Sequence, residues 1–239
     1  MKNKALLLAA GLGTRLRPIT NTLPKCLVEI GNKPILEIWL DKLNQAGCQE
    51  VLINTHYLAN KIKKFLQFKK YKNMRIHTTY EPKLLGTAGT LIQNANFFSK
   101  ENNNLLIHAD NFTNADLTKF HKFHMNFTIP SENLITMMTF RSNNPEKCGI
   151  VEIDKNGQVK NFYEKDSNFH GNIANAAIYF FKYDLIEILL KNKRKFTDFS
   201  LDVIPLLIGK IKTYHINEEL IDIGTKENLD LARKIYKSL

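Results

Sequence analysis

Cysteine is scarce in this chain: only three occur among its 239 residues. Cys26, Cys48 and Cys148 are scattered along the sequence and odd in number, so they suit neither a disulfide framework nor a zinc cluster. We expect reduced, structural thiols, which favour a cytoplasmic location.

Long apolar runs are also missing. No stretch approaches the roughly 18 apolar residues that a membrane span needs, and the N-terminal MKNKALLLAAG reaches glycine after a short apolar run. No repeat, low-complexity tract or linker interrupts the sequence. We therefore expect a soluble, uncleaved protein that folds as one domain over residues 1–239.

Acidic residues are outnumbered, with 23 Asp and Glu against 34 Lys and Arg and a formal net charge of +11. Such a balance is typical of nucleic-acid binders. However, the densest basic groups carry no interleaved aromatic stacking surface; they are KIKK (61–64), KKYK (69–72) and KNKRK (191–195). A solvated basic surface that attracts anionic small molecules is favoured, and no nucleic-acid partner is expected.

Short apolar runs alternate with helical patterns before residue 140. Strands are expected at 5–10, 51–56, 75–80, 104–110 and 134–140, and helices at 34–47, 59–68, 88–98 and 117–124. This βαβ alternation predicts an α/β fold with a doubly wound, mostly parallel, Rossmann-like sheet.

The pattern changes after residue 140, where a more antiparallel portion is expected. Residues 149–154 and 158–165 flank Asn156-Gly157, which indicates a hairpin. A further strand is expected at 175–181, and helices are expected at 183–193, 199–208 and 226–238, the last of them preceded by KTYHI (212–216).

Residues 6–34, LLLAAGLGTRLRPITNTLPKCLVEIGNKP, carry the strongest functional signal. An apolar strand runs into a loop in which Gly11 and Gly13 let backbone N–H groups approach phosphates, and Arg15 and Lys25 add positive charge. The loop lacks both familiar phosphate motifs: Leu16 stands where G-x-G-x-x-G needs glycine, and there is no Walker A G-K-[ST]. We interpret it as a nucleoside triphosphate site.

Two carboxylates complete this picture. Asp110 ends the apolar run LLIHAD, and a residue at the carboxyl end of such a strand faces the ligand crevice of an open α/β sheet. Asp222, in LIDIGT, precedes a glycine turn and a helix. If both reach one crevice they can hold Mg²⁺ against a triphosphate. Alternatively, Asp110 is a turn residue and Asp222 caps the last helix.

The string A-G-x-G-T-R-L-x-P-x-T followed by P-K resembles the signature of the sugar-1-phosphate nucleotidyltransferases, which include thymidylyl- and guanylyltransferases. The resemblance covers nearly the whole chain. It implies transfer of a nucleotidyl group from a nucleoside triphosphate to a sugar 1-phosphate, giving an NDP-sugar and pyrophosphate for surface polysaccharide precursors. Residues 1–140 would form the nucleotide-binding half and residues 141–239 the sugar-phosphate-binding half.

The resemblance also implies roles for individual residues. Arg15 and Lys25 would be catalytic, and Asp110 and Asp222 would bind Mg²⁺. Glu164 and Lys165, in NFYEK, would serve the sugar phosphate together with Asn175, although a capped strand start also explains Asn175. The nucleotide would be bound by Leu8, Ala10, Gly11, Gly13, Thr14 and by Gly86 in LGTAG (85–89).

The base and the acceptor stay open. LGTAG favours GTP with mannose- or heptose-type phosphates, but thymidylyl, uridylyl and cytidylyl enzymes share the scaffold. Many members have Gly-Asp where this chain has Ala109-Asp110. A non-catalytic sugar-nucleotide sensor and a phosphocholine-like cytidylyltransferase, with Tyr163 and Glu164 around the ammonium group, are the alternatives. A homo-oligomer is also compatible with the sequence.

Overall fold

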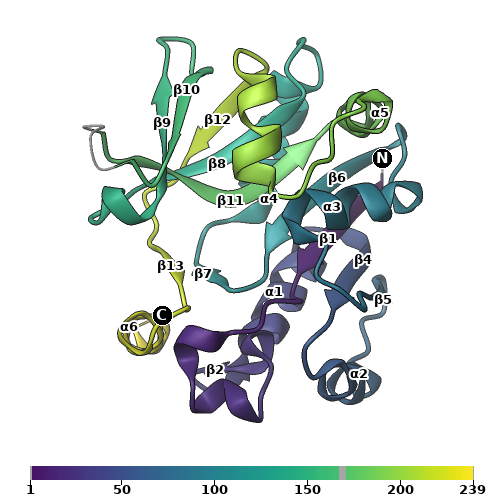
Figure 1. Cartoon of the computed structure of the whole chain (residues 1–239), viewed down its shortest axis with the longest axis vertical. Coiled ribbons are helices and arrows are strands. Elements are labelled where there is room, and N and C mark those ends of the chain that lie inside the picture. The colour runs from purple at the N-terminus through teal and green to yellow at the C-terminus, as the bar shows by residue number, and fades with distance from the viewer. Residues whose placement is uncertain (1, 167–170, 239) are drawn as a thin grey trace. The chain divides into compact units, whose positions relative to one another are not determined.

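The computed structural model describes residues 2–166 and 171–238 (Figure 1). The fold is mixed α/β with a large, mostly parallel central sheet, as the sequence predicts. Its residues group into two compact units built from non-contiguous segments. Unit 1 contains Leu85–Leu106 and Ala115–Glu219, and unit 2 contains Asn3–Leu84, Ile107–Asn114 and the chain from Leu220 on.

Unit 2 is built around three parallel strands in the order β1-β4-β5. Their bounds are Lys2–Leu8 (β1), Cys48–Thr55 (β4) and Arg75–Tyr80 (β5). Three helices accompany them: α1 (Ile35–Gln45), α2 (Ala59–Gln67) and α6 (Lys226–Lys237). Ala5, Leu6 and Leu7 are fully buried, so β1 is apolar on both faces, as a covered parallel strand requires.

Two small antiparallel pairs complete unit 2. They are β2 (Glu29–Ile30) with β3 (Lys33–Pro34), and β7 (Asn111–Thr113) with β13 (Leu220–Asp222). Neither pair is visible in the sequence, because strands of two or three residues are too short to show a period.

Unit 1 carries the antiparallel part of the sheet. The strands β8 (Ile135–Arg141), β9 (Gly149–Ile153), β10 (Val159–Glu164) and β11 (Ile173–Phe181) pair antiparallel, and β12 (Ile211–His215) runs parallel to β8. The β6 strand (Asn102–His108) crosses along the chain from unit 1 into unit 2. The helices are α3 (Gly86–Gln93), α4 (Leu117–Phe123) and α5 (Tyr183–Lys191).

The predicted strands are confirmed, with shifts of no more than three residues at their ends. The helix expected over 199–208 is wrong. A π-helical turn at Phe199–Val203 and a 3₁₀ turn at Pro205–Leu207 replace it, since Pro205 has no N–H to donate to a continuous helix. The helix expected over 88–98 begins at Gly86 and ends at Gln93.

All three cysteines are free thiols, and Cys26 and Cys48 are buried. Burial raises the pKa of both buried thiols to about 12, so they stay protonated and inert. Within the described part of the chain, no helix has the length and apolar character to cross a bilayer.

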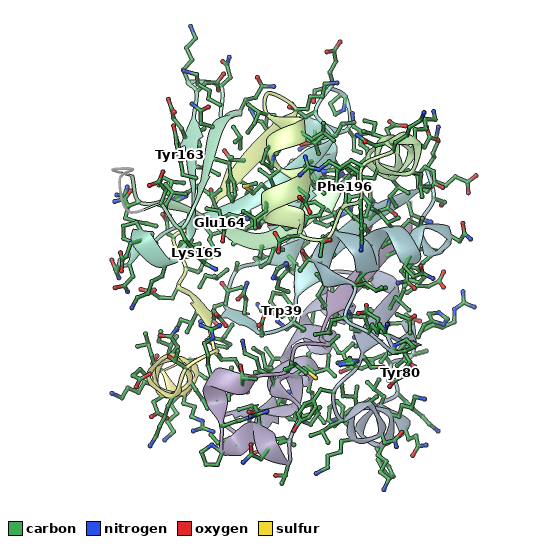
Figure 2. The ribbon with its side chains drawn as sticks, in the orientation of Figure 1. Trp39, Tyr80, Tyr163, Glu164, Lys165 and Phe196 are labelled. Atoms are coloured by element: carbon green, nitrogen blue, oxygen red, sulfur yellow. The ribbon has the colours of Figure 1, made fainter. Side chains whose placement is uncertain are left out.

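Trp39 links the core of unit 2 to the β6–β7 turn. Its ring is 1% exposed on α1, and its Nε1–H donates to the Asn111 carbonyl oxygen at 2.8 Å (Figure 2). We expect Trp39→Ala to lower the free energy of unfolding by about 3–5 kcal/mol, and Trp39→Phe by about 1–2 kcal/mol because it removes mainly the hydrogen bond. Denaturant unfolding checks both values. Equal losses in the two variants would contradict a dominant packing role.

Candidate active site

The loop after β1 is fixed by hydrogen bonds from its own unit. Ala9 N–H donates to Asn54 Oδ1 at 2.6 Å, and Asn54 Nδ2 donates to Glu81 Oε1 at 2.9 Å. Ala109 N–H donates to the Leu8 carbonyl oxygen at 3.1 Å. These hydrogen bonds therefore connect the carboxyl ends of four strands that are neighbours in the sheet: β6, β1, β4 and β5.

Gly13 has a structural reason for being glycine. Its φ is +64°, and a Cβ there would lie 3.0 Å from Thr20 Cγ2 and 3.2 Å from Lys25 Cβ. The Thr20 hydroxyl donates to the Gly13 carbonyl oxygen at 2.7 Å. Gly13 thus lets the loop pack against the segment that carries Lys25. Gly11 differs, since a Cβ there would meet nothing within 4 Å.

Lys25 joins the two aspartates that the sequence singles out. Its Nζ lies 2.6 Å from Asp110 Oδ2 and 2.8 Å from Asp222 Oδ1. The lysine side chain is only 8% exposed, whereas those of Asp110 and Asp222 are 36% and 42% exposed. Both carboxylates are therefore partly exposed to solvent, whereas the ammonium group that they share is nearly buried.

The charges of this cluster shift the pKa values of Lys25 and Asp110. Burial alone would lower the pKa of Lys25, but the charges of Asp110 and Asp222 raise it above the ordinary value. Burial alone would raise the pKa of Asp110, but Lys25 and, next, His108 lower it below the ordinary value. Both shifts favour the charged form, so Lys25 and Asp110 stabilise each other's charge.

Arg15 adds a second cation. Its Nη2 lies 3.2 Å from Asp222 Oδ2, and its side chain is 65% exposed. A Cβ at Gly224 would lie 2.6 Å from that Nη2 and 3.0 Å from Asp222 Oδ1. Gly224 therefore leaves the space in which the guanidinium group reaches Asp222.

The β7–β13 pair brings the two aspartates together. Asp222 ends β13 opposite Asn111, the residue after Asp110, and Ile223 N–H donates to the Asp110 carbonyl oxygen at 3.1 Å. The Asp222 carbonyl oxygen accepts from Asn228 Nδ2 at 2.8 Å. Strand pairing therefore places two aspartates next to each other that are 112 positions apart in the sequence.

The helix-cap alternative for Asp222 is wrong. The N-cap of α6 is Thr225, whose hydroxyl accepts from Asn228 N–H at 3.3 Å. Asp222 uses its carboxylate on Lys25 and Arg15 instead.

Glu164 and Lys165 lie in unit 1, at the end of β10 (Figure 2). Lys165 Nζ is 3.6 Å from Glu164 Oε1, and the lysine side chain is 66% exposed. Burial raises the pKa of Glu164, and Lys165 opposes that shift. A Cβ at Gly149 would lie 2.5 Å from the Phe162 ring and 2.6 Å from Glu164 Oε2, so glycine at this position leaves room for both side chains.

Asn175 lies inside β11 rather than at its start. Its Nδ2 donates to the Tyr179 hydroxyl at 2.6 Å, and its Oδ1 accepts from Ala177 N–H at 3.0 Å. These bonds stabilise the irregularity between Asn175 and Tyr179, where Ala177 has a φ of +53°. The amide therefore has a structural role, and the capped strand start is wrong.

Gly86 begins α3 with a φ of +77°. A Cβ there would lie 2.3 Å from the Thr197 carbonyl oxygen, which accepts from Ala88 N–H at 3.0 Å. Contact with Thr197 is a sufficient reason for glycine, so a nucleoside contact at Gly86 stays a prediction.

The structure thus brings together the side chains of Arg15, Lys25, Asp110 and Asp222, all in unit 2. Unit 2 also contains the predicted nucleotide-binding residues Leu8, Ala10, Gly11, Gly13 and Thr14. It pairs Glu164 with Lys165 in unit 1. The sequence does not point to the supporting residues Asn54, Gly149 and Asn228, and it does not explain why residue 224 is glycine. Of these four residues, only Gly224 could have been noticed, because it stands two residues after a predicted metal ligand.

The chain matches the family model described as nucleotidyl transferase over residues 4–238. The mannose-1-phosphate guanylyltransferase catalytic subunit beta of Drosophila melanogaster is 32% identical over 98% of this chain and 63% of its own length. The protein of that name from Dictyostelium discoideum is 30% identical over 98% of this chain and 64% of its own length. The chain spans less than two thirds of these relatives.

Solved structures share the fold. A Bacillus anthracis protein assigned as a glucose-1-phosphate thymidylyltransferase superposes with a TM-score of 0.89 at 20% identity, covering 99% of this chain and 96% of that one. HddC from Yersinia pseudotuberculosis, complexed with GMP-PN, gives a TM-score of 0.80 at 23% identity, covering 98% and 99%. With its signature loop and its family match over residues 4–238, this chain belongs to the nucleotidyl transferase family.

Proposed function

We propose that this protein is a sugar-1-phosphate nucleotidyltransferase. It transfers a nucleotidyl group from a nucleoside triphosphate to a sugar 1-phosphate and releases pyrophosphate. The observation that carries the proposal is Lys25 held at 2.6 and 2.8 Å between two partly exposed aspartates, beside Arg15 and the Gly11–Gly13 loop. The names of the curated relatives favour GTP as the donor and mannose 1-phosphate as the acceptor.

The donor set fits a hard divalent cation. Asp110 and Asp222 both place a carboxylate oxygen on one ammonium group, so both carboxylates reach a common cation. Mg²⁺ takes one or two carboxylates and completes its shell with phosphates and water. Among the described residues no group of three or more His, Cys, Asp and Glu could hold a metal alone. This agrees with a metal whose remaining ligands come from the nucleotide. When bound, Mg²⁺ would neutralise phosphate charge.

The chain's own residues would position and neutralise the reacting groups. Arg15 uses one nitrogen on Asp222, and its exposed guanidinium group has further N–H donors for the triphosphate. Lys25 supplies a fixed positive charge near the α-phosphate. Loop N–H groups at Leu8, Ala10, Gly11, Gly13 and Thr14 would bind the nucleotide, with Gly86 as a further contact.

In unit 1, Glu164 would accept hydrogen bonds from sugar hydroxyls, Lys165 would bind the acceptor phosphate, and Asn175 would orient Tyr179 beside them. The acceptor oxygen is already an anion at neutral pH. Therefore no general base is required, and catalysis rests on positioning and charge. The reaction would supply NDP-sugars for polysaccharide synthesis in the cytoplasm, by a monomer or a homo-oligomer.

The phosphocholine alternative has no support in the strand geometry. Tyr163 and Glu164 are neighbours on β10, so their side chains point to opposite faces. The Tyr163 hydroxyl contacts Glu152 on β9 at 3.5 Å. These two side chains do not form one pocket for an ammonium group.

A pyrophosphate-release assay tests the proposal. We expect release with GTP, Mg²⁺ and mannose 1-phosphate together, and background signal when any one of the three is omitted. UTP, dTTP and CTP, and glucose 1-phosphate, form the comparison panel. Tight nucleotide binding without turnover across the whole panel would instead favour the sensor function.

Gly224→Ala should displace the Arg15 guanidinium group from Asp222. Gly224 does not have a left-handed φ, and the new methyl group would meet side-chain atoms rather than backbone, with Arg15 Nη2 at 2.6 Å and Asp222 Oδ1 at 3.0 Å. We expect the melting temperature to stay within about 2 °C and KM for the triphosphate to rise about tenfold, as in Arg15→Ala, with no further rise in the double variant. Additive effects in steady-state kinetics would contradict a shared site.

Lys165→Ala should mainly weaken acceptor binding. The lysine is 66% exposed, and alanine at the same φ of +51° adds no new strain, so folding is preserved. We expect KM for the sugar 1-phosphate to rise about tenfold while KM for the triphosphate is unchanged. Lys160→Ala, an exposed lysine on the same strand, is the matched control and should behave as wild type. A selective rise in the triphosphate KM would refute the assignment.

A further inference from the structure

Helix α2 and the turn after it form a cationic surface that the proposed reaction does not use. Residues 61–72, KIKKFLQFKKYK, contain six lysines and no acidic residue; we refer to them as the α2 surface. Lys61 donates to the Thr22 carbonyl oxygen, and Lys69 pairs with Glu37. The other four are exposed, and none forms an ion pair with any described residue: Lys63, Lys64, Lys70 and Lys72.

An apolar side chain stands among these cations. Phe68 is 84% exposed, although the chain on its C-terminal side is anchored. The Tyr71 hydroxyl donates to Asp41 at 2.7 Å, Met74 is 5% exposed, and Tyr71 bridges to Met74. The exposure of Phe68 is therefore built into the fold rather than caused by fraying of the helix end.

The surface also has an open groove of about 630 Å³. Its lining includes the apolar side chains of Leu66, Met74 and Ile76 together with Lys63 and Lys70. A lining that combines apolar and cationic side chains suits an amphiphile that carries a negative group.

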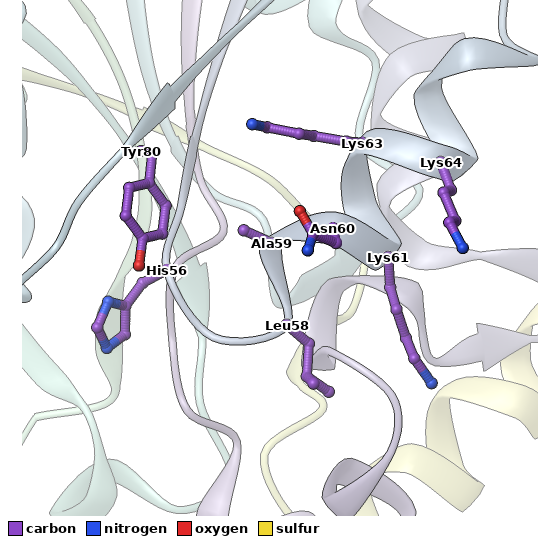
Figure 3. A pocket seen from close by; sticks show the side chains of 8 residues that line it. All are labelled: His56, Leu58, Ala59, Asn60, Lys61, Lys63, Lys64 and Tyr80. Carbon is purple, nitrogen blue, oxygen red and sulfur yellow. The ribbon is translucent and has the colours of Figure 1, made fainter.

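The lysines at the other end of α2 diverge. Figure 3 shows the Lys63 side chain extending toward Tyr80, whereas Lys61 and Lys64 extend away from it. Cations that spread apart do not enclose one small anion. Lys63 lines the groove together with Lys70, and cations spaced along one groove match an extended anionic surface.

We propose that the α2 surface docks this protein on an anionic lipid bilayer. The exposed lysines would meet lipid phosphates, and Phe68 would enter the headgroup region. A single-stranded nucleic acid is less favoured because it needs successive aromatic platforms, and of the three aromatic residues in this segment only Phe68 is exposed, whereas Phe65 and Tyr71 are half-buried. The nearby acids do not cancel the charge, since Lys69 pairs with Glu37 and Lys33 with Asp41.

Vesicle sedimentation tests the proposal. The full chain is mixed with vesicles of phosphatidylcholine alone, or with 30 mol% phosphatidylglycerol, at low and at about 0.15 M salt. We expect binding only to the anionic vesicles, weakened by salt. Each lysine near such a surface contributes about fivefold in affinity, so Lys63→Glu with Lys70→Glu should reduce partitioning at least about 25-fold. Phe68→Ser should reduce it about tenfold.

The matched control is Lys193→Glu with Lys195→Glu, which changes net charge equally on exposed lysines of unit 1. It should retain most of the binding, and melting temperatures should show that all variants fold. Absence of binding to anionic vesicles, or equal loss in the control, would overturn the proposal. So would binding of a fluorescent single-stranded oligonucleotide that needs Lys63 and Lys70 in the absence of vesicle binding.

Discussion

Lys25→Met is expected to lower kcat by about 10²- to 10³-fold, because it removes a fixed positive charge from the site where charge develops. Methionine keeps most of the length and volume of the lysine in its nearly buried position. The loss should fall mainly on kcat rather than on KM for either substrate. Initial-rate kinetics in which both substrate concentrations are varied separate the effect on kcat from the effects on the two KM values.

The same variant should bind free divalent metal more tightly. In the wild-type protein the Lys25 ammonium group lies at 2.6 and 2.8 Å from the two carboxylates, where it competes with any cation for their oxygens. Without it, we expect Mn²⁺ affinity in the absence of nucleotide to rise at least about tenfold, by titration calorimetry.

Lys33→Met provides the control for this measurement. Lys33 also pairs with an aspartate, Asp41, at 2.7 Å, but lies outside the cluster. It should leave both kcat and Mn²⁺ binding unchanged. Unchanged Mn²⁺ binding in Lys25→Met would show that Asp110 and Asp222 do not form the cation site.

Asp110→Asn and Asp222→Asn form the second large prediction. Each variant should lower kcat/KM by about 10²- to 10³-fold and raise the Mg²⁺ concentration needed for half-maximal activity. In the double variant the fold-loss of kcat/KM should be much smaller than the product of the two single losses, because both residues bind one cation. The readout is a Mg²⁺ titration of all four proteins.

Stability should change little in these two variants. Each asparagine keeps an oxygen for Lys25 but loses the charge on it, and the carboxylates are 36% and 42% exposed, so water screens part of the interaction. We expect each to lower the free energy of unfolding by about 1 kcal/mol. Independent, multiplicative kinetic losses would argue against a common cation.

Local sequence patterns predict the fold well where an element has a strong period. The strand at Arg75–Tyr80 matches its prediction at both ends, and Lys155-Asn156-Gly157 lies in the turn between β9 and β10 as expected. The failures have physical causes. Pro205 breaks the helical pattern of 199–208, and β7 and β13 are three-residue strands that exist only because they pair with each other.

The charged residues of the site are predictable because their chemistry is visible in the sequence. Their arrangement is not. Pairing of Asn111 with Asp222 decides that both aspartates reach Lys25, and this register depends on a contact between distant segments. Gly224 likewise looks like an ordinary turn glycine until Arg15 is seen beside it.

For the same reason LGTAG cannot be read from sequence alone. Its first glycine is explained by the Thr197 carbonyl oxygen, 111 residues farther along the chain. The predicted division into halves at residue 140 stays a prediction. In the α2 surface the sequence shows the lysines directly. It does not show that Phe68, which stands between them, is exposed.

The fate of a labelled α-phosphate tests the central claim most directly. The protein is incubated with Mg²⁺, mannose 1-phosphate and GTP labelled at the α-phosphorus, and the products are treated with phosphatase and separated. Nucleotidyl transfer predicts that the label appears in a phosphatase-resistant sugar nucleotide, in a one-to-one ratio with released pyrophosphate. Label that remains entirely in GTP, GDP or GMP while the acceptor is unchanged would contradict it.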